Sequence, residues 1–572
     1  MQGGESEVSF QLNTMKASIL LTCFTLISTA FIAAAEEPLA PDAIKQILVE
    51  RIEKEKRATG LVVGTIDEHG TNIVACGKLS LNSDKQVAGD TVFEIGSVSK
   101  VFTSLVLADM AQRGEVKLDD PIAKYLPPSV KVPARKGKQI TLVDLATHTS
   151  GLPRLPDNFE PADNTDPYAD YSVQQMYDFL SNYTLMRDIG AKYEYSNFGA
   201  GLLGHILALR AGTNYEALVR ERICRPLGMT DTAVTLSPAM KARLAQGHNA
   251  AGRAVPEWHL PTLAGAGGIH STLNDLLKLA AASLGLLDTP LGKAIALAET
   301  PRRDADSATT QIGLAWHITK RFGSELIWHN GATGGYHSYI GLDKEKKRAV
   351  VVLANSSSSI DDIGQHLLEP KYPLRKLKTS KAPAIVAPES KLLERCVGRY
   401  QLSPKFFFNI RRADDHLQVQ LTGQGYLDIF PESETRFFCE DVNAQISFAT
   451  NEAARVTSLT LHQNGTDQTA SKISDEVPND PVPIKLDAGV LDAYAGKYQL
   501  QPEVFFIVRR SGDRLLAQLT GQGFYQVFPR TETDFFYKVV DAQLTFVKNA
   551  KGEVTALILH QNGMDQEAQR LK

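Results

Sequence analysis

The sequence predicts an α/β domain followed by two small all-β domains. Strand-turn-strand patterns stand at both ends of residues 36–370, and mostly helical patterns lie between them. Beyond that segment, a block of short runs that alternate apolar and polar residues occurs twice in one constant register. We therefore expect one sheet built from both ends of the first segment, and then two small barrels or curled sheets.

The first residues have the pattern of an export signal. Met15 and Lys16 precede an uncharged stretch at 17–32, and three alanines at 33–35 come before two glutamates. A charged start, an apolar core and small residues at a cleavage site are typical of a secretory signal. We therefore expect residues 1–35 to be a leader and signal peptide, and the protein to be periplasmic or extracellular. A membrane anchor is the alternative, but ~16 apolar residues are short for a span of ~20.

Two hairpins are expected in the α/β segment. The apolar run at 61–66, the turn residues at 67–70 and the apolar run at 73–76 form the first pattern. The second pattern is a pair of apolar runs at 339–342 and 349–354 around a charged turn. Such pairs of β-rich runs around a short polar turn predict antiparallel strands.

The C-terminal part contains an internal duplication. Gly-Arg-Tyr-Gln-Leu at 398–402 matches Gly-Lys-Tyr-Gln-Leu at 496–500, and Gln-Leu-Thr-Gly-Gln-Gly occurs at 420–425 and at 518–523. A fixed register without slips is what tandem duplication of one folding unit leaves. The predicted boundaries are an α/β domain at 36–370, a linker at 371–395, a first β repeat at 396–475, a linker at 476–490 and a second β repeat at 491–572.

Composition limits the classes of function. The chain is 43% hydrophobic and 22% charged, as in globular proteins, and its formal net charge is -4. A nucleic-acid partner is not expected, because no basic excess is present to neutralise phosphates. No Cys-x-x-Cys and no His-Glu-x-x-His occurs among the 572 residues, so we expect neither a metal nor a cofactor. The oligomeric state and any cysteine pairing stay open.

Ser97 and Lys100 form the chain's one Ser-x-x-Lys motif. Apolar residues at a nearly helical spacing follow it and end at Gly114, which predicts a helix. Residues three apart on a helix share a face, so the amine of Lys100 can reach the Ser97 oxygen and assist removal of its proton. Alone, this motif is weak, because a chain of this length should contain roughly one or two such pairs by chance.

Two further motifs follow in chain order. Tyr195 and Asn197 form the one Tyr-x-Asn, and His329 and Gly331 form a His-x-Gly before an expected strand. A glycine there lets a substrate approach the backbone closely. Each motif has a structural alternative, with Tyr195 as a buried phenol and His329 as a turn residue. Their combination with Ser97 favours nucleophilic catalysis.

These three motifs, in this order, resemble the signature of the penicillin-recognising serine hydrolases, class C β-lactamase-like branch. The stretches at 114–121, 147–153 and 226–232 resemble that branch as well. The resemblance covers about residues 40–370, and the repeats look like the small β domains appended to some members. It implies a β-lactamase/transpeptidase-like fold, with an antiparallel sheet flanked by helices plus a helical region.

The resemblance also implies roles for individual residues. Ser97 would be the nucleophile, and Lys100 and Tyr195 would share the proton transfer, with either one serving as base and with both pKa values depressed from about 10. Asn197 would hydrogen-bond the substrate amide or the lysine. The backbone N–H groups of Ser97 and Ala332 would form the oxyanion hole. His329 and Gly331 would line the substrate site.

The sequence departs from the class C pattern at His329, where lysine is usual. Histidine is mostly neutral at pH 7, so a permanent cation for a substrate carboxylate is missing. Efficient β-lactam hydrolysis is therefore in doubt. The leading hypothesis is an acyl-enzyme mechanism on D-amino-acid peptides, including cell-wall peptides, or on β-lactam amides. A carboxylesterase acting on small acyl esters is the alternative, and a penicillin-binding sensor without turnover is a third reading. No Gly-x-Ser-x-Gly occurs, which argues against an α/β-hydrolase.

Overall fold

The computed structural model describes the chain from Leu39 onward, with gaps. The described residues are 39–54, 58–159, 161–163, 165–249, 252–375 and 390–571, the last range without 404–405, 414–415, 423–425, 440–443, 464–465, 478–481, 503, 521, 523, 539 and 562–563. The expected signal peptide at 1–35 therefore lies outside the described residues, as do parts of both expected linkers.

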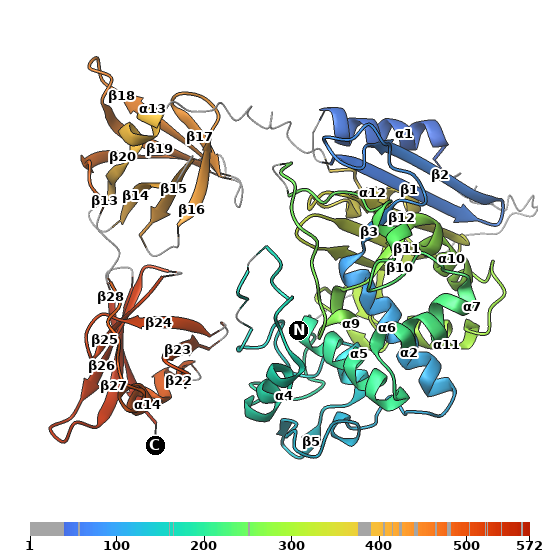
Figure 1. Cartoon of the computed structure of the whole chain (residues 1–572), viewed down its shortest axis with the longest axis horizontal. Helices are drawn as coiled ribbons and strands as arrows, with labels where there is room; N and C mark the ends of the chain where they lie inside the picture. The colour runs from blue at the N-terminus through green and yellow to red at the C-terminus, as the bar shows by residue number, and fades with distance from the viewer. Residues whose placement is uncertain are drawn as a thin grey trace, which may run out of the picture. The chain divides into compact units, whose positions relative to one another are not determined.

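The first part of the chain is built around one antiparallel sheet of eight strands (Figure 1). Both predicted hairpins are present in it, and the expected fold class is confirmed. In spatial order the strands are β2 (Gly70–Gly77), β1 (Gly60–Asp67), β12 (Arg348–Ala354), β11 (His337–Asp343), β10 (Ser324–Ala332), β9 (His317–Arg321), β8 (Thr310–Ile312) and β7 (Arg303–Asp304).

The two ends of this segment meet where β1 pairs with β12. Leu61 lies opposite Ala354, and the pairing runs antiparallel from there. Successive side chains of a strand point to opposite faces, so each strand serves two cores. Leu61 and Val63 pack with one core, and Val62 packs with the other. The near-continuous apolar runs therefore reflect a sheet that is covered on both faces.

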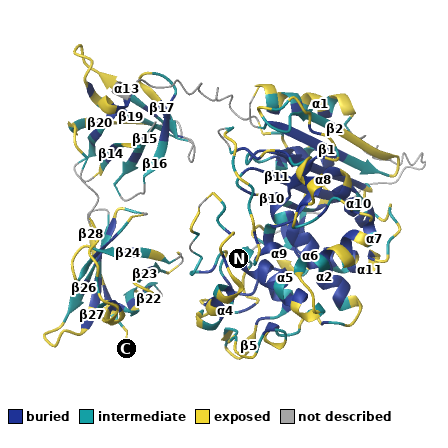
Figure 2. Cartoon of the chain, in the orientation of Figure 1, coloured by how far each residue is buried: buried dark blue, intermediate teal, exposed yellow. Residues whose placement is uncertain are grey.

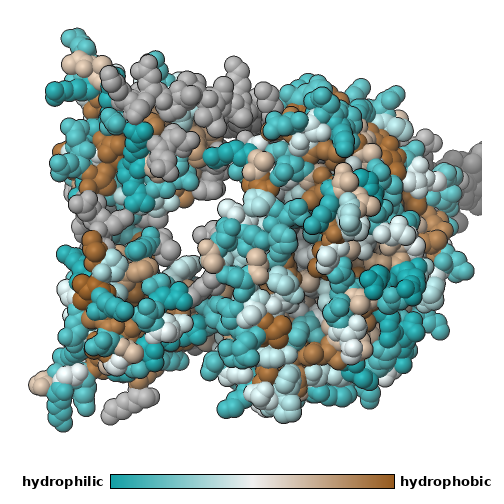
Figure 3. Space-filling model, in the orientation of Figure 1, coloured by the Kyte–Doolittle hydropathy of each residue, from teal (hydrophilic) through white to brown (hydrophobic). Residues whose placement is uncertain are grey.

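Helices cover the two faces of the sheet, whose central strands are dark blue in Figure 2. Helices α1 (Pro41–Val49) and α12 (Asp361–Leu368) share the core of Leu61, and α10 (Leu273–Ser283) packs on the opposite face with Val62. The visible surface mixes polar and apolar side chains (Figure 3). The other helices of this part are α2 (Ser99–Gln112), α3 (Leu142–Ala146), α4 (Val173–Asn182), α5 (Asn197–Ala211), α6 (Tyr215–Val219), α7 (Arg225–Leu227), α8 (Pro238–Lys241), α9 (Ala264–Gly267) and α11 (Gly292–Glu299). Short 3-10 or π turns occur at Glu50–Lys54, Gly96–Val98 (η2), Ile122–Lys124 and Arg220–Cys224.

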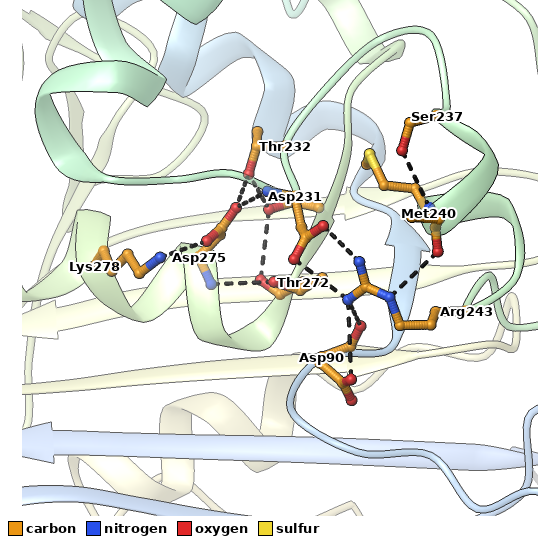
Figure 4. Close-up of polar contacts among 11 residues, drawn as sticks. Asp90, Asp231, Thr232, Ser237, Met240, Arg243, Thr272, Asp275 and Lys278 are labelled. Carbon is orange, nitrogen blue, oxygen red and sulfur yellow. Dashed lines mark hydrogen bonds and ion pairs between the residues drawn. The ribbon is translucent and has the colours of Figure 1, made fainter.

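A small two-stranded sheet leads to the site. Strand β3 (Val92–Glu94) pairs with β6 (His270–Thr272), and a second small sheet joins β4 (Ala134–Arg135) to β5 (Lys138–Gln139). Polar contacts hold the surroundings of the β3–β6 sheet (Figure 4). Arg243 bonds the carboxylate of Asp231 at 2.5 Å and the backbone carbonyl of Asp90 at 2.8 Å. Asp275 accepts from the Asp231 N–H at 2.7 Å and from the Thr232 hydroxyl at 2.9 Å. Arg243 and Asp275 together therefore link the segment just before β3 to the helix that follows β6.

Each repeat forms a closed antiparallel barrel of eight strands. The repeats were expected as barrels or curled sheets, and the barrel is confirmed for both. The first barrel contains β13 (Gly398–Ser403), β14 (Phe406–Ala413), β15 (His416–Leu421), β16 (Leu427–Pro431), β17 (Arg436–Cys439), β18 (Ala444–Thr450), β19 (Val456–Gln463) and β20 (Thr466–Ser474). The second contains β21 (Gly496–Gln501), β22 (Val504–Ser511), β23 (Arg514–Leu519), β24 (Tyr525–Pro529), β25 (Asp534–Tyr537), β26 (Ala542–Lys548), β27 (Val554–Gln561) and β28 (Met564–Arg570).

A short helix precedes each barrel and joins its core. Helix α13 (Ser390–Cys396) buries Leu393, and α14 (Ala488–Tyr494) buries Leu491. Both helices begin inside segments that were predicted to be linkers, at 371–395 and 476–490. Short helical turns of this kind give a weak periodic signal, because only one or two side chains face the core. Within the part of the chain that the structure describes, no helix has the length and apolar character that crossing a membrane requires.

Candidate active site

Ser97 lies in the tight connection between β3 and α2. It occupies the 3-10 turn η2, and α2 begins two residues later. Gly96 has a φ of +47°, a left-handed conformation that glycine tolerates best, and it turns the chain from the strand into the helix. The predicted helix is confirmed as α2, but Ser97 lies before its first turn rather than within it.

Lys100 lies one turn further along and is 1% exposed. Its Nζ lies 2.9 Å from the Ser97 Oγ, 2.9 Å from the Asn197 Oδ1 and 2.6 Å from the backbone oxygen of Ala266. Burial, and secondarily the charge of Arg154, hold the pKa of Lys100 well below its usual value. The predicted lowering of this pKa is confirmed in direction, and its cause is chiefly desolvation.

The three contacts fix what the Lys100 amine can do. Two of them are carbonyl oxygens, Asn197 Oδ1 and Ala266 O, which only accept hydrogen bonds. A neutral amine has two N–H groups and one lone pair. In the neutral form that the lowered pKa favours, both N–H groups can be donated to these oxygens, which leaves the lone pair for the Ser97 hydroxyl. The same contact then joins a base to the proton it would remove.

Tyr195 lies beside the same amine, with the Lys100 Nζ 4.8 Å from its ring centroid. The prediction that its pKa is depressed is wrong. Burial raises the pKa of Tyr195 to about 12, although a hydrogen bond with Ser97 and the charge of Arg154 oppose the rise. Desolvation penalises a phenolate, so the ring stays protonated at neutral pH. Tyr195 is therefore equipped to donate a proton.

Asn197 is the first residue of α5. Ser196 caps this helix, since its Oγ accepts from the Gly199 N–H at 2.8 Å. The Asn197 carboxamide uses its oxygen for Lys100 and donates from Nδ2 to the Tyr168 hydroxyl at 3.3 Å. The cap therefore fixes the backbone from which this amide reaches Lys100.

The last residues of β10 pass directly behind Ser97. A Cβ on Gly331 would meet the Ile95 carbonyl oxygen and would lie 2.9 Å from the Ser97 nitrogen. A Cβ on Gly96 would lie 2.8 Å from the Ala332 nitrogen. Glycine at both positions allows the backbone N–H groups of Ser97 and Ala332 to come close together, as an oxyanion hole requires.

His329 lies on β10 and is fully buried, at 0% exposure. Its Nδ1 lies 2.6 Å from the backbone oxygen of Asn330, so this nitrogen carries the proton. Burial, with lesser contributions from His317 and Lys100, holds the pKa of His329 well below its usual value. The sequence predicted a mostly neutral imidazole on the general pKa of histidine, and burial enforces that state.

Two histidines that were not predicted as site residues, His148 and His317, lie beside Tyr195 and His329. The His148 ring is 4.5 Å from the Tyr195 ring, and the His317 ring is 5.3 Å from the His329 ring. Burial lowers the pKa of His148 strongly and that of His317 to about 4. All three imidazoles are therefore neutral and form an uncharged layer behind Tyr195. His148 was within one of the family-like stretches, but nothing in its spacing linked it to Tyr195.

The opening above Ser97 is a narrow pocket with aromatic walls. Tyr168, Trp258 and Thr333 line it together with the residues already described. The Trp258 backbone N–H donates to the Glu94 carboxylate at 2.8 Å. Burial raises the pKa of Glu94 to about 7. Arg154 has its guanidinium carbon 5.1 Å from the Tyr195 ring centroid, and its side chain is exposed.

The comparison with known families agrees with this geometry. The profile described as Beta-lactamase matches residues 45–367, more than half of the chain. The chain belongs to the Beta-lactamase family. The profile described as "Domain of unknown function (DUF3471)" matches 382–473 and 480–572, so both barrels are copies of one domain. Among the described residues, no group of three or more His, Cys, Asp or Glu side chains is placed to hold a metal ion.

Individual relatives align with the first part of the chain, and one of them aligns over a longer stretch. The chain is 28% identical over 360 residues to the D-alanyl-D-alanine-carboxypeptidase/endopeptidase AmpH of Escherichia coli, which covers 60% of this chain and 92% of the relative. It is 24% identical over 459 residues to penicillin-binding protein 4* of Bacillus subtilis, across 74% of this chain and 97% of the relative. A solved β-lactamase/D-alanine carboxypeptidase of Yersinia pestis, complexed with citrate, matches with a TM-score of 0.51 and 25% identity over 57% of this chain and 97% of its own. As a member of the Beta-lactamase family, this chain is a serine hydrolase.

Proposed function

We propose that the protein hydrolyses D-amino-acid peptides, of the DD-carboxypeptidase or endopeptidase type, or β-lactam amides, through an acyl-enzyme on Ser97. The observation that carries this proposal is the buried Lys100 amine, which lies 2.9 Å from the Ser97 Oγ and within hydrogen-bond distance of two carbonyl oxygens. A desolvated neutral amine at this distance is a competent base for a serine hydroxyl.

The proposed acylation step begins with proton transfer from the Ser97 hydroxyl to the Lys100 amine. The Ser97 Oγ forms a bond to the substrate carbonyl carbon, and the carbonyl electron pair moves to its oxygen. The N–H groups of Ser97 and Ala332 stabilise this oxyanion. The tetrahedral intermediate then breaks the bond to the leaving nitrogen. Water later attacks the acyl carbon and gives one proton to the Lys100 amine. The bond from this carbon to the Ser97 Oγ then breaks, the Oγ takes that proton back, and the acid is released.

Tyr195 supplies the proton that the leaving nitrogen requires. Its pKa of about 12 keeps it a phenol at neutral pH, and it lies in contact with Ser97. After donation, the phenolate regains a proton from the ammonium of Lys100, which restores the neutral amine. The two residues therefore act in sequence, with Lys100 as base and Tyr195 as acid.

Arg154 is the proposed partner of a substrate carboxylate. His329 is neutral and buried, so it cannot pair with a negative charge. Arg154 has an exposed side chain next to the Tyr195 ring, where its charge also acts on Lys100. A terminal carboxylate of a D-peptide, or the carboxylate of a β-lactam, would find its cation there.

A carboxylesterase is the second candidate. The neutral histidine layer of His148, His317 and His329 favours it, since an ester needs no cation behind the serine. The pattern at 1–35 supports export to the periplasm or outside the cell. This location is compatible with both the peptide or β-lactam hydrolase and the carboxylesterase. A sensor without turnover is less favoured, because Lys100 and Tyr195, the proposed base and acid, both contact Ser97.

A substrate panel with detection of the covalent adduct tests the proposal. A D-alanyl-D-alanine peptide, a chromogenic cephalosporin and a short-chain nitrophenyl ester are compared, and the peptide containing Ser97 is examined by mass spectrometry. We expect an acyl adduct on Ser97 and fastest turnover of the D-peptide. Faster turnover of the ester would favour the second candidate, and a lasting penicillin adduct without product would favour the sensor. Ser97→Ala should abolish hydrolysis, and residual activity within tenfold of the parent would refute the assignment.

A further inference from the structure

The first barrel contains an apolar cavity in its lumen. The cavity has a volume of about 230 Å³ and is lined by eight apolar side chains, Cys439 and Gln463. None of the ten lining residues carries a charge. Folded interiors are normally close-packed, and an unfilled apolar cavity costs stability. This cavity therefore requires an explanation.

The cavity lies at one end of the barrel. Helix α13 joins the core at the other end, where the Tyr400 hydroxyl donates to the Cys396 carbonyl at 2.7 Å. The lining residues Leu421, Cys439 and Gln463 end strands β15, β17 and β19. Alternate strands of an antiparallel barrel run in the same direction, so the ends of β15, β17 and β19 lie at the same rim. All three side chains are only partly buried, so this end of the cavity lies near the surface of the barrel.

The second barrel provides a matched comparison within the same chain. The register of the repeat places Tyr537 at the position of Cys439, and the strand pairing agrees, since Ile429 faces Cys439 and Val527 faces Tyr537. The Tyr537 ring packs against the core of the second barrel. Gln463 and its counterpart Gln561 are the same residue type. The duplicate thus has a large ring where the first barrel has a small thiol.

We infer that the lumen of the first barrel binds a small, uncharged, largely apolar molecule that carries one hydrogen-bonding group. The eight apolar side chains, and the absence of a charge among the described lining residues, select an apolar, uncharged body. The Gln463 carboxamide at the rim both donates and accepts hydrogen bonds, which suits a single polar group of the ligand. Engineered apolar cavities of about 150 Å³ bind benzene. The cavity of about 230 Å³ in the first barrel is larger, so it accommodates a bicyclic aromatic molecule.

Indole is a suitable probe, because it combines an apolar bicyclic body with one N–H donor. Titration of the full chain with indole, followed by calorimetry, is expected to give one bound molecule per chain. Cys439→Tyr copies the second barrel and should fill the cavity. We expect at least a tenfold loss of indole affinity in this variant and a higher thermal midpoint, which also establishes that the barrel has folded.

Tyr537→Cys is the matched variant in the second barrel. It should open the corresponding space, so the expected stoichiometry rises from one indole to two. Indole-2-carboxylate is the charged control, and we expect its affinity to be at least tenfold lower than that of indole. Unchanged indole binding in Cys439→Tyr, or no indole binding by the parent chain, would overturn the inference. This test does not depend on the activity of Ser97.

Discussion

Burial of the Lys100 amine is the feature on which the chemistry depends at the level of single residues. The folded pKa of Lys100 lies well below the usual 10.5 of an exposed lysine. Between the folded and the unfolded pKa, the unfolded chain binds one more proton than the folded chain. The free energy of unfolding therefore rises with pH in this window, by about 1.4 kcal/mol per pH unit.

Lys100→Met should remove this contribution. The variant loses the hydrogen bonds to Asn197 and Ala266, which shifts its stability by an amount that does not change with pH. We expect the free energy of unfolding of the parent, relative to Lys100→Met, to increase from pH 7 toward pH 10. Urea denaturation of both proteins at several pH values measures this difference. A constant difference across that range would contradict a buried neutral amine.

Arg154→Gln tests the carboxylate partner. We expect kcat/KM for a D-alanyl-D-alanine peptide to fall about tenfold, which corresponds to about 1.4 kcal/mol. A neutral nitrophenyl ester should lose little, since it has no carboxylate. The charge of Arg154 also lowers the pKa of Lys100, so the acidic limb of both pH profiles should move to higher pH. Equal losses for peptide and ester at every pH would rule out a contact with the carboxylate.

The sequence predicted the residue types of the site better than their protonation. Ser97 and Lys100 could be paired from local helical spacing, because three residues span one turn. The rise in the pKa of Tyr195 could not be predicted, since it comes from burial by segments distant in sequence. His148 and His317 were missed for the same reason, as their approach to Tyr195 and His329 is tertiary.

At the level of elements, the site depends on the approach of β10 to η2. The hairpins were predictable from alternating apolar residues, whereas this approach joins segments more than two hundred residues apart and leaves no local periodic signal. Gly331 was selected because glycine admits close contact, and the structure identifies the contact as the backbone at Ile95 and Ser97. The strand end and the turn therefore function as one unit.

Gly331→Ala should separate these two elements. Its Cβ would collide with the Ile95 carbonyl, so β10 must shift and the Ala332 N–H must move relative to Ser97. Loss of one oxyanion donor typically costs about 10²–10³ in kcat. We expect a fall of that order in kcat and a lower thermal midpoint. Gly292→Ala, at the start of α11, is the control, because a Cβ there meets nothing within 4 Å. Equal activities of the two variants would contradict the role of this approach.

At the scale of the whole chain, each folded part has its own hydrophobic core. The cores of the first part draw on residues between Leu39 and Leu374, the core of the first barrel on Leu393 to Ala470, and that of the second on Leu486 to Ala568. Duplication could be predicted from the register of the repeats. The packing of the Tyr537 ring against the core of the second barrel could not be predicted, because it depends on tertiary contacts.

Separate cores predict that the hydrolase part folds without the barrels. A chain that ends at Arg375 keeps every residue of the two cores around the eight-stranded sheet, so we expect it to unfold in one cooperative transition. That transition should coincide with one of those seen in calorimetry of the full chain, and the barrel transitions should be missing. Ser97 should still react with a fluorescent penicillin. Ser97→Ala in the shortened chain is the control for specific labelling. Failure of the shortened chain to fold would mean that the barrels stabilise the hydrolase part directly, and the division into independent cores would be wrong.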